Sequence, residues 1–180
     1  MNYKYTNAFA ISFLLAAANL PKLDLNLVSS LTPVYPAGLS GLALLLLRVS
    51  VGGLFILHGY PKLTHLRQWS AALKMPVFLC FLSAASMFGG GIFLILGLLT
   101  LLATIPIFCS MLFAAYLDIT GGKPPVAQDP YLIPEGQYRG PNGIGEPPSW
   151  EKAFIYCVVL IAIAILGPGA YSIDASIFGK

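Results

Sequence analysis

The stretch LSGLALLLLRVSVGGLFILHGYPKL, residues 39–63, decides the fold class of this chain. Its first 21 residues, from Leu39 to Gly59, contain a single charged residue, Arg48. At about 1.5 Å per residue, a helix of this length is roughly 30 Å long, which matches the hydrocarbon thickness of a bilayer. The stretch therefore predicts a helix that spans a membrane and that kinks or stops at Pro61.

The small and polar residues of this predicted helix recur every three or four positions and therefore share one face. They are Arg48, Gly52, Phe55, Gly59 and Lys62. An arginine in the middle of a span costs about 2.5–3.5 kcal/mol on insertion scales. We therefore expect this face to contact protein, and we expect Arg48 to find a partner elsewhere in a helix bundle.

The composition also indicates an integral membrane protein. Of the 180 residues, 57% are hydrophobic and 9% are charged, whereas a soluble domain has about 25% charged residues. The net charge of +3 and the dispersed cations argue against a nucleic-acid partner. The three cysteines lie in apolar runs without a CxxC pair, so we interpret them as packing residues and predict neither a metal site nor a catalytic residue pair.

Three further spans are predicted after the first. Residues 76–117 form an uncharged apolar run of 42 residues, which is too long for one span and right for two that join at a turn near residues 99–102. The three predicted spans are residues 77–98, 102–118 and 150–166. The predicted fold class is therefore an all-α, integral membrane four-helix bundle at residues 38–176, followed by a short tail at residues 177–180.

Residues 1–37 form a separate N-terminal segment. Its apolar run from Ala8 to Leu20 has 13 residues, which is short for a span, and Pro21 follows it. We interpret this run as an interfacial or re-entrant helix that ends at Pro21, and the segment as lying along the membrane surface. The alternative is a secretory signal, because Ala16 and Ala18 form the A-x-A pattern of a cleavage site.

A long loop, residues 119–150, joins the predicted third and fourth helices. Its central part, residues 121–149, contains seven prolines and six glycines, which argue against regular structure. A loop of this length is either disordered or a functional surface, and its larger side chains are of the types that anchor interfaces. We expect it to be ordered against a partner or against the chain's own helix bundle. The candidate residues for docking on a partner are Tyr131, Leu132, Ile133, Tyr138 and Trp150.

Six glycines in the first two predicted helices are candidates for close helix packing in lipid. They are Gly52, Gly59, Gly89, Gly90, Gly91 and Gly97. Because small residues let two backbones approach closely, we expect these positions to lie at helix contacts. The alternative for residues 89–97 is a glycine surface that a cofactor or a quinone approaches.

Three motifs resemble the DoxX family of membrane proteins. LLRVSVGGLFILHGYPKL at residues 46–63 resembles the first-helix motif of the family, GGGIFLILGLLT at 89–100 its glycine-bearing second helix, and GPGAYSIDA at 167–175 its closing motif. The resemblance covers about residues 42–176 and implies a membrane bundle of four helices. Many members carry a glutamate just before the glycines of the second helix, where this chain has Ser-Met-Phe at residues 86–88.

The resemblance implies a membrane subunit of an electron-transfer system. Related DoxD proteins are the small membrane subunit of a thiosulfate:quinone oxidoreductase, so a quinone-facing role in such an enzyme is the leading hypothesis. No cofactor is expected to be intrinsic to the chain, and quinone is the candidate ligand. The candidate contacts to a quinone or an anion are Arg48, His58, Lys62 and Asp174.

These four residues also have structural interpretations, which stay open. Arg48 can be a buried charge that fixes helix register, and Asp174 can cap a turn. His58 and Lys62 can be anchors at the membrane interface. On a straight helix, Arg48 and Lys62 would lie about 20 Å apart, so the two cations cannot hold one small ligand together.

A second hypothesis makes the protein a non-catalytic accessory subunit that docks in a larger respiratory or photosynthetic complex. Both hypotheses predict membrane lipid and other membrane subunits as partners, in a prokaryotic inner membrane or another energy-transducing membrane. By the positive-inside rule, both connections are predicted to be cytoplasmic, because they contain lysines and arginines. The connections are residues 64–75 and 121–151.

Overall fold

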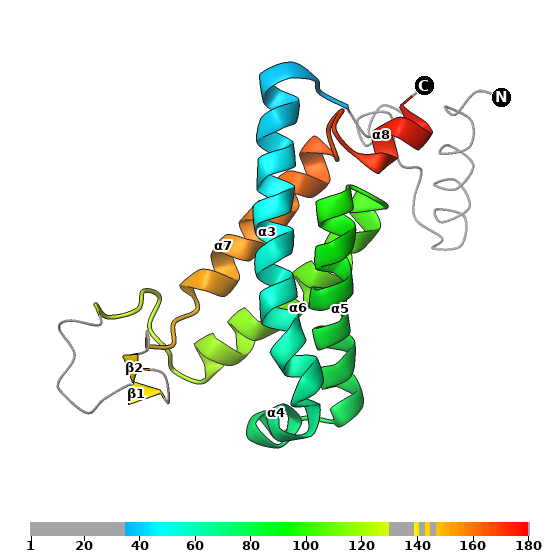
Figure 1. Ribbon diagram of the computed structural model, residues 1–180. Helices are drawn as coiled ribbons and strands as arrows, with labels where there is room; N and C mark the ends of the chain where they lie inside the picture. Colours follow the sequence, from blue (N-terminus) through cyan, green and yellow to red (C-terminus); the bar gives the residue numbers. More distant parts are fainter. Residues whose placement is uncertain (1–34, 130–138, 141–142, 145–146, 180) are drawn as a thin grey trace, which may run out of the picture.

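The computed structural model describes residues 35–129, 139–140, 143–144 and 147–179 of the chain. The predicted interfacial segment, apart from its last residues, and four of the five predicted docking residues lie outside this part. The four long helices are α3 (Gly38–Thr64), α5 (Val77–Leu96), α6 (Thr100–Thr120) and α7 (Glu151–Leu166) (Figure 1). The shorter elements are α4 (Leu66–Leu73), β1 (Arg139–Gly140), β2 (Gly143–Ile144) and α8 (Ile173–Phe178).

Three of the long helices are able to cross a membrane by their length and composition. They are α3 with 27 residues, α5 with 20 and α6 with 21. The prediction of a helical membrane protein is therefore confirmed at this level. The fourth long helix, α7, has 16 residues and packs beside α6.

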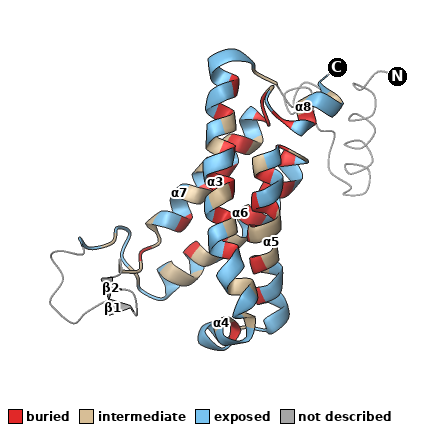
Figure 2. Ribbon diagram, in the orientation of Figure 1, coloured by how far each residue is buried: buried red, intermediate tan, exposed pale blue. Residues whose placement is uncertain are grey.

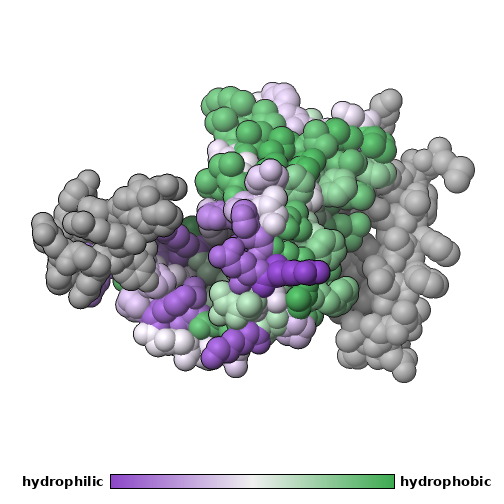
Figure 3. Space-filling view, turned by 60° about the horizontal axis from the view of Figure 1, so that its bottom comes forward, coloured by the Kyte–Doolittle hydropathy of each residue, from purple (hydrophilic) through white to green (hydrophobic). Residues whose placement is uncertain are grey.

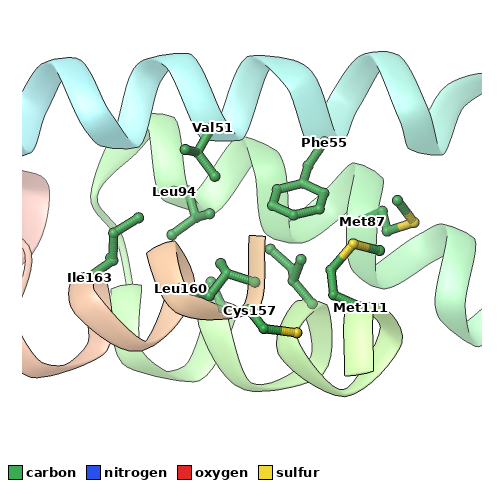
Figure 4. Close-up of a cluster of buried hydrophobic side chains, with 10 residues drawn as sticks. Val51, Phe55, Met87, Leu94, Met111, Cys157, Leu160 and Ile163 are labelled. Carbon is green, nitrogen blue, oxygen red and sulfur yellow. The ribbon is translucent and has the colours of Figure 1, made fainter. Parts of the chain in front are cut away.

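The four long helices share one apolar core (Figure 4). Phe55 of α3, Leu94 of α5, Ile107 of α6 and Ile163 of α7 are all fully buried in it. The outward faces of the same helices are exposed (Figure 2). They carry apolar side chains as well, such as Leu57 of α3. A chain with apolar residues both inside and outside is suited to a lipid environment, in which outward side chains contact acyl chains.

Glycines set the distance between α3 and α5. A Cβ atom on Gly52 would lie 2.6 Å from the carbonyl oxygen of Gly91, and a Cβ on Gly91 would lie 2.6 Å from that of Gly52. A Cβ on Gly59 would lie 2.6 Å from the backbone nitrogen of Phe88. These positions admit no larger residue without a movement of the backbone, so the two helices pack almost backbone to backbone.

The remaining predicted packing glycines differ from one another. Gly90 faces the side chain of Ile107 on α6, 2.7 Å from a Cβ atom built on the glycine. Within the part of the chain that the structure describes, Gly89 has nothing within 4 Å of such an atom, so it makes no close helix contact there. Gly97 follows α5 with a φ of +62°, a left-handed conformation that favours glycine, and it makes room for the side chain of Arg48.

Helix boundaries depart from the sequence prediction at three places. The first span does not stop at Pro61, because α3 continues to Thr64 with the proline inside its last turn. The following connection contains the helix α4, which was not predicted from the sequence. The turn between α5 and α6 lies at residues 97–99, slightly earlier than predicted, and the next helix begins at Thr100.

The two ends of the long loop are joined by a hydrogen bond. The backbone N–H of Trp150 donates to the carbonyl oxygen of Pro124 at 3.3 Å. Within the loop, β1 pairs antiparallel with β2, so the expectation that the prolines exclude all regular structure is wrong for these two short strands. The loop therefore leaves and re-enters the helical part of the molecule at one place.

The molecule has two ends of different character (Figure 1). We call the end that carries α4, Pro124 and Trp150 the loop end, and the end that carries residues 97–99 and α8 the turn end. A view toward the loop end shows hydrophilic residues gathered there, with hydrophobic residues around them (Figure 3). The exposed cations Arg67, Lys74 and Lys152 belong to this end.

Candidate functional site

A groove between α4, α5 and α6 runs inward from the loop end. Its volume is about 880 Å³, within the range of roughly 300–1,000 Å³ that is usual for small-molecule sites. Most of its lining is apolar, and on α6 it extends from Ile105 to Asp118. Thirteen residues of helical rise give it a length of roughly 20 Å.

Three serine hydroxyls lie in the wall of the groove where α5 meets α6. The Ser110 hydroxyl donates to the Ser83 oxygen at 2.9 Å, and the Ser86 and Ser110 oxygens are 3.1 Å apart. The Ser86 hydroxyl also lies 2.8 Å from the backbone carbonyl oxygen of Ser83, and 3.4 Å from that of Pro106. We call Ser83, Ser86 and Ser110 the serine cluster.

The local sequence explains how the cluster forms. Ser83 and Ser86 are three residues apart on α5 and so lie on one face of that helix. Ser110 lies opposite them on α6, four residues after Pro106, which lacks an N–H group and therefore leaves one carbonyl of the preceding turn without its helical partner. The serine cluster is thus the polar part of a contact between α5 and α6 that is otherwise apolar.

Lys62 lines the groove from the last turn of α3. Its ammonium donates to the Met87 sulfur at 3.4 Å and lies 4.9 Å from the centre of the Trp69 ring. The other lysine of the groove, Lys123, is paired with Asp118 at 2.6 Å. Within the described residues, no carboxylate lies at ion-pair distance from Lys62. Among the residues that the structure describes, its partners are a thioether and an aromatic face, both weak acceptors.

His58 does not belong to the groove. It is exposed on α3, and its ring lies edge-on to Tyr156 of α7 at 6.3 Å between ring centres. Although Lys62 follows four residues later on the same helix, the two side chains approach different neighbours. The structure therefore does not bring these two predicted contacts together on one cavity.

Arg48 lies at the turn end and is completely buried. One guanidinium nitrogen donates to the carbonyl oxygen of Leu94 at 3.2 Å, and another donates to that of Tyr171 at 2.5 Å. Leu94 belongs to the last turn of α5, and Tyr171 to the segment between α7 and α8. The prediction that Arg48 finds a partner inside the protein is thus confirmed, although its partners are backbone carbonyl groups and not a carboxylate hydrogen-bonded to it.

Asp174 completes the same polar arrangement from α8. Its two oxygens accept the backbone N–H groups of Leu99 at 2.7 Å and Thr100 at 2.9 Å, and also the Thr100 hydroxyl at 2.9 Å. Its own N–H donates to the carbonyl oxygen of Gly97 at 2.9 Å. Asp174 therefore caps the N-terminus of α6, where a negative charge also interacts favourably with the helix dipole. We call Arg48, Asp174 and the backbone groups that they bind the polar latch.

The four predicted contact residues are therefore divided among three places. Arg48 and Asp174 meet at the turn end, Lys62 lines the groove at the loop end, and His58 lies on α3 outside the groove. Trp150, the described member of the predicted docking set, is half-buried against Phe154 with 5.9 Å between ring centres.

The serine cluster was not predicted. Its signal in the sequence is weak, since serines three residues apart also occur in ordinary helix contacts.

Comparison with protein families supports the resemblance seen in the motifs. The family model described as DoxX matches residues 43–118, which include α4, α5 and most of α3 and α6. No curated protein and no solved structure matches the chain. The predicted resemblance is thus confirmed over the matched residues, which contain Arg48, Lys62 and the serine cluster. The closing motif at residues 167–175 lies beyond them.

Proposed function

We propose, from a DoxX domain at residues 43–118, that this protein is a membrane subunit of an electron-transfer system and that its groove binds a quinone. The proposal includes a thiosulfate:quinone-type oxidoreductase as the parent enzyme. The observation that carries it is the position of Lys62, a half-buried cation that lacks an acidic partner among the described residues and lines an apolar groove of about 880 Å³.

The chemistry of the groove matches a lipid-soluble ligand with polar oxygens. Its rim contains apolar side chains that are exposed outside the helix packing, among them Leu79, Leu82 and Ile105. A quinone has a carbonyl-bearing ring on an apolar tail. The ammonium of Lys62 is able to donate to such a carbonyl, and Trp69 offers a flat aromatic face beside it.

The proposal also includes α7 as a fourth membrane span. Its 16 residues have no charge after Lys152, and its outward residues Ile155, Val158 and Ile165 are apolar. Its inward residues join the common core. If α7 spans, cysteines introduced by Lys152→Cys and Ser176→Cys should react with an impermeant maleimide from opposite sides of oriented vesicles. Labelling from one side only would contradict the fourth span.

Quinone binding is tested with the purified protein in lipid nanodiscs and decylubiquinone. Trp69 lines the groove, so a bound quinone should quench its fluorescence, and Trp150→Phe removes the other tryptophan signal. We expect saturable quenching in this background. Lys62→Met should weaken binding about 10-fold or more, since hydrogen bonds to charged groups contribute roughly 1.5–3 kcal/mol.

Lys152→Met is the matched control. It removes an exposed lysine at the same end of the molecule that does not line the groove, so it should leave the affinity unchanged. Quenching that rises linearly without saturation would indicate simple partition of quinone into lipid. That result, or equal affinity in Lys62→Met and Lys152→Met, would exclude the groove as the quinone site.

A second candidate function is the accessory subunit docked in a larger membrane complex, and the hydrogen bond between Trp150 and Pro124 makes it testable. Because this bond joins the two ends of the loop, a short Gly-Ser linker can replace residues 125–149 without separating α6 from α7. If the loop docks the protein, the shortened protein should fold but no longer co-purify with its complex. Continued co-purification would contradict the docking role.

A further inference from the structure

We propose that the serine cluster, Ser83, Ser86 and Ser110, is an oxygen-binding subsite of the groove that holds both the oxidised and the reduced form of a quinone. The inference rests on the proposed function, because it concerns the same groove. It adds which side chains hold the ligand oxygen and which redox forms they accept. Its starting point is the hydrogen-bond arrangement of the three hydroxyls.

The cluster has one hydroxyl hydrogen to spare. Ser110 donates to Ser83, and Ser86 has the Ser83 carbonyl as its nearest acceptor. The Ser83 hydroxyl accepts the bond from Ser110, and within the described residues no acceptor for its own hydrogen is found. A hydroxyl that is half-buried in an apolar groove gains a hydrogen bond when a ligand offers an oxygen to it.

The cluster also has acceptor capacity. Each serine oxygen carries two lone pairs, and a hydroxyl rotates to donate or to accept as its neighbour requires. A quinone carbonyl only accepts a hydrogen bond, whereas the hydroxyl of a quinol also donates one. The serine cluster therefore matches both forms without a change of charge.

Lys62 cannot adapt in the same way. An ammonium group has three donors and no acceptor, so it interacts with a ligand oxygen but cannot receive the hydrogen of a quinol. An anionic headgroup would instead be attracted mainly by Lys62 and would need nothing from neutral hydroxyls. The response of the two sites to substitution therefore separates a quinone and quinol pair from an anionic amphiphile.

Cys109 provides the readout, because it is exposed and lines the groove, whereas Cys80 and Cys157 are buried. Modification by N-ethylmaleimide is followed at each cysteine by mass spectrometry. Decylubiquinone and, without oxygen, decylubiquinol are titrated until Cys109 is half-protected. Ser83→Ala should raise this concentration about 3- to 10-fold for both forms, as loss of one neutral hydrogen bond implies.

The controls separate a local effect from a general one. Ser50→Ala removes an exposed serine of α3 outside the groove and should change neither titration. Ser83→Thr keeps the hydroxyl and should restore binding. Lys62→Met should weaken the quinone more than the quinol.

The possible outcomes also distinguish this inference from the proposed function. If neither redox form protects Cys109 in the wild-type protein, the proposed quinone site itself fails. If both forms protect, but Ser83→Ala behaves like Ser50→Ala, only the serine subsite is overturned. Protection by dodecanoate that depends on Lys62 and not on Ser83 would also overturn the subsite, and would identify an anionic amphiphile as the occupant.

Discussion

The two ends of the molecule differ in the burial and in the hydrogen-bond partners of their cations. At the turn end, Arg48 is fully buried, and its terminal nitrogens are satisfied by carbonyl groups from two other segments. At the loop end, Lys62 is half-buried beside a groove and has a thioether and an aromatic ring as partners. Both cations come from one face of α3, separated by fourteen positions in the sequence.

This difference suggests how to tell a structural charge from a binding one in a membrane helix. A fully buried cation whose terminal nitrogens donate to backbone carbonyls is closed off from a ligand, and its removal takes a donor from those carbonyls. A cation with weak partners beside a cavity contributes less to folding and has donors available. The polar latch is therefore expected to govern stability, and the groove to govern binding.

The largest expected effect is that of Arg48→Ala. The substitution removes the side-chain donor to the carbonyl of Tyr171 and one of the two donors to that of Leu94, and it opens a cavity in the core, so the free energy of unfolding should fall by about 3–5 kcal/mol. Arg48→Lys should restore little, because one ammonium cannot reproduce the geometry of the guanidinium. Thermal unfolding in a fixed detergent, with the yield of monodisperse protein, measures this. If Arg48→Ala were as stable as the wild type, Arg48 would not be a structural charge, and it would not differ from Lys62 in this respect.

An intermediate effect is expected for Gly97→Ala. The residue has a φ of +62°, and an added Cβ atom would collide with the Arg48 guanidinium. Gly122→Ala is the matched control, because its φ is +74° and nothing lies within 4 Å. Backbone strain alone costs about 1–2 kcal/mol, so Gly122→Ala should lose that amount and Gly97→Ala roughly 1–3 kcal/mol more. If Gly97→Ala and Gly122→Ala lost the same unfolding free energy, the Arg48 side chain would be able to move away from the added Cβ atom at little cost.

The smallest expected effect on stability is that of Lys62→Met. The substitution keeps the length of the stem and removes contacts that are individually weak, so the free energy of unfolding should change by less than about 1 kcal/mol. The same variant is the one expected to lose quinone affinity. A destabilisation as large as that of Arg48→Ala would assign Lys62 to the fold and not to the groove.

Much of the helical framework could be predicted from the sequence, because hydrophobic length and periodicity are local properties. The inward orientation of Arg48 followed from its spacing with Gly52 and Gly59. For Asp174, the sequence left a turn cap and a binding role open, and the observed bonds to Leu99 and Thr100 account for it as a cap.

The groove could not be predicted in the same way, because it depends on the relative register of two helices. Ser83 meets Ser110 across 27 positions of sequence, and their alignment is set by the turn at residues 97–99. The single-helix pattern around Ser83 gives no information on what lies opposite. The sequence also left open whether α3 kinks or stops at Pro61. The helix does not stop, since proline at the last turn removes one hydrogen bond and the helix tolerates this near its end.

The bond between Arg48 and Tyr171 has a consequence for how the chain is made. The two residues are 123 positions apart, so at about 5–20 residues per second the arginine is synthesised roughly 6–25 s before its second acceptor exists. During that interval the nascent first helix carries a guanidinium group whose hydrogen bonds are incomplete. A chain that ends before Tyr171 therefore lacks one of the two carbonyl acceptors of this buried guanidinium group.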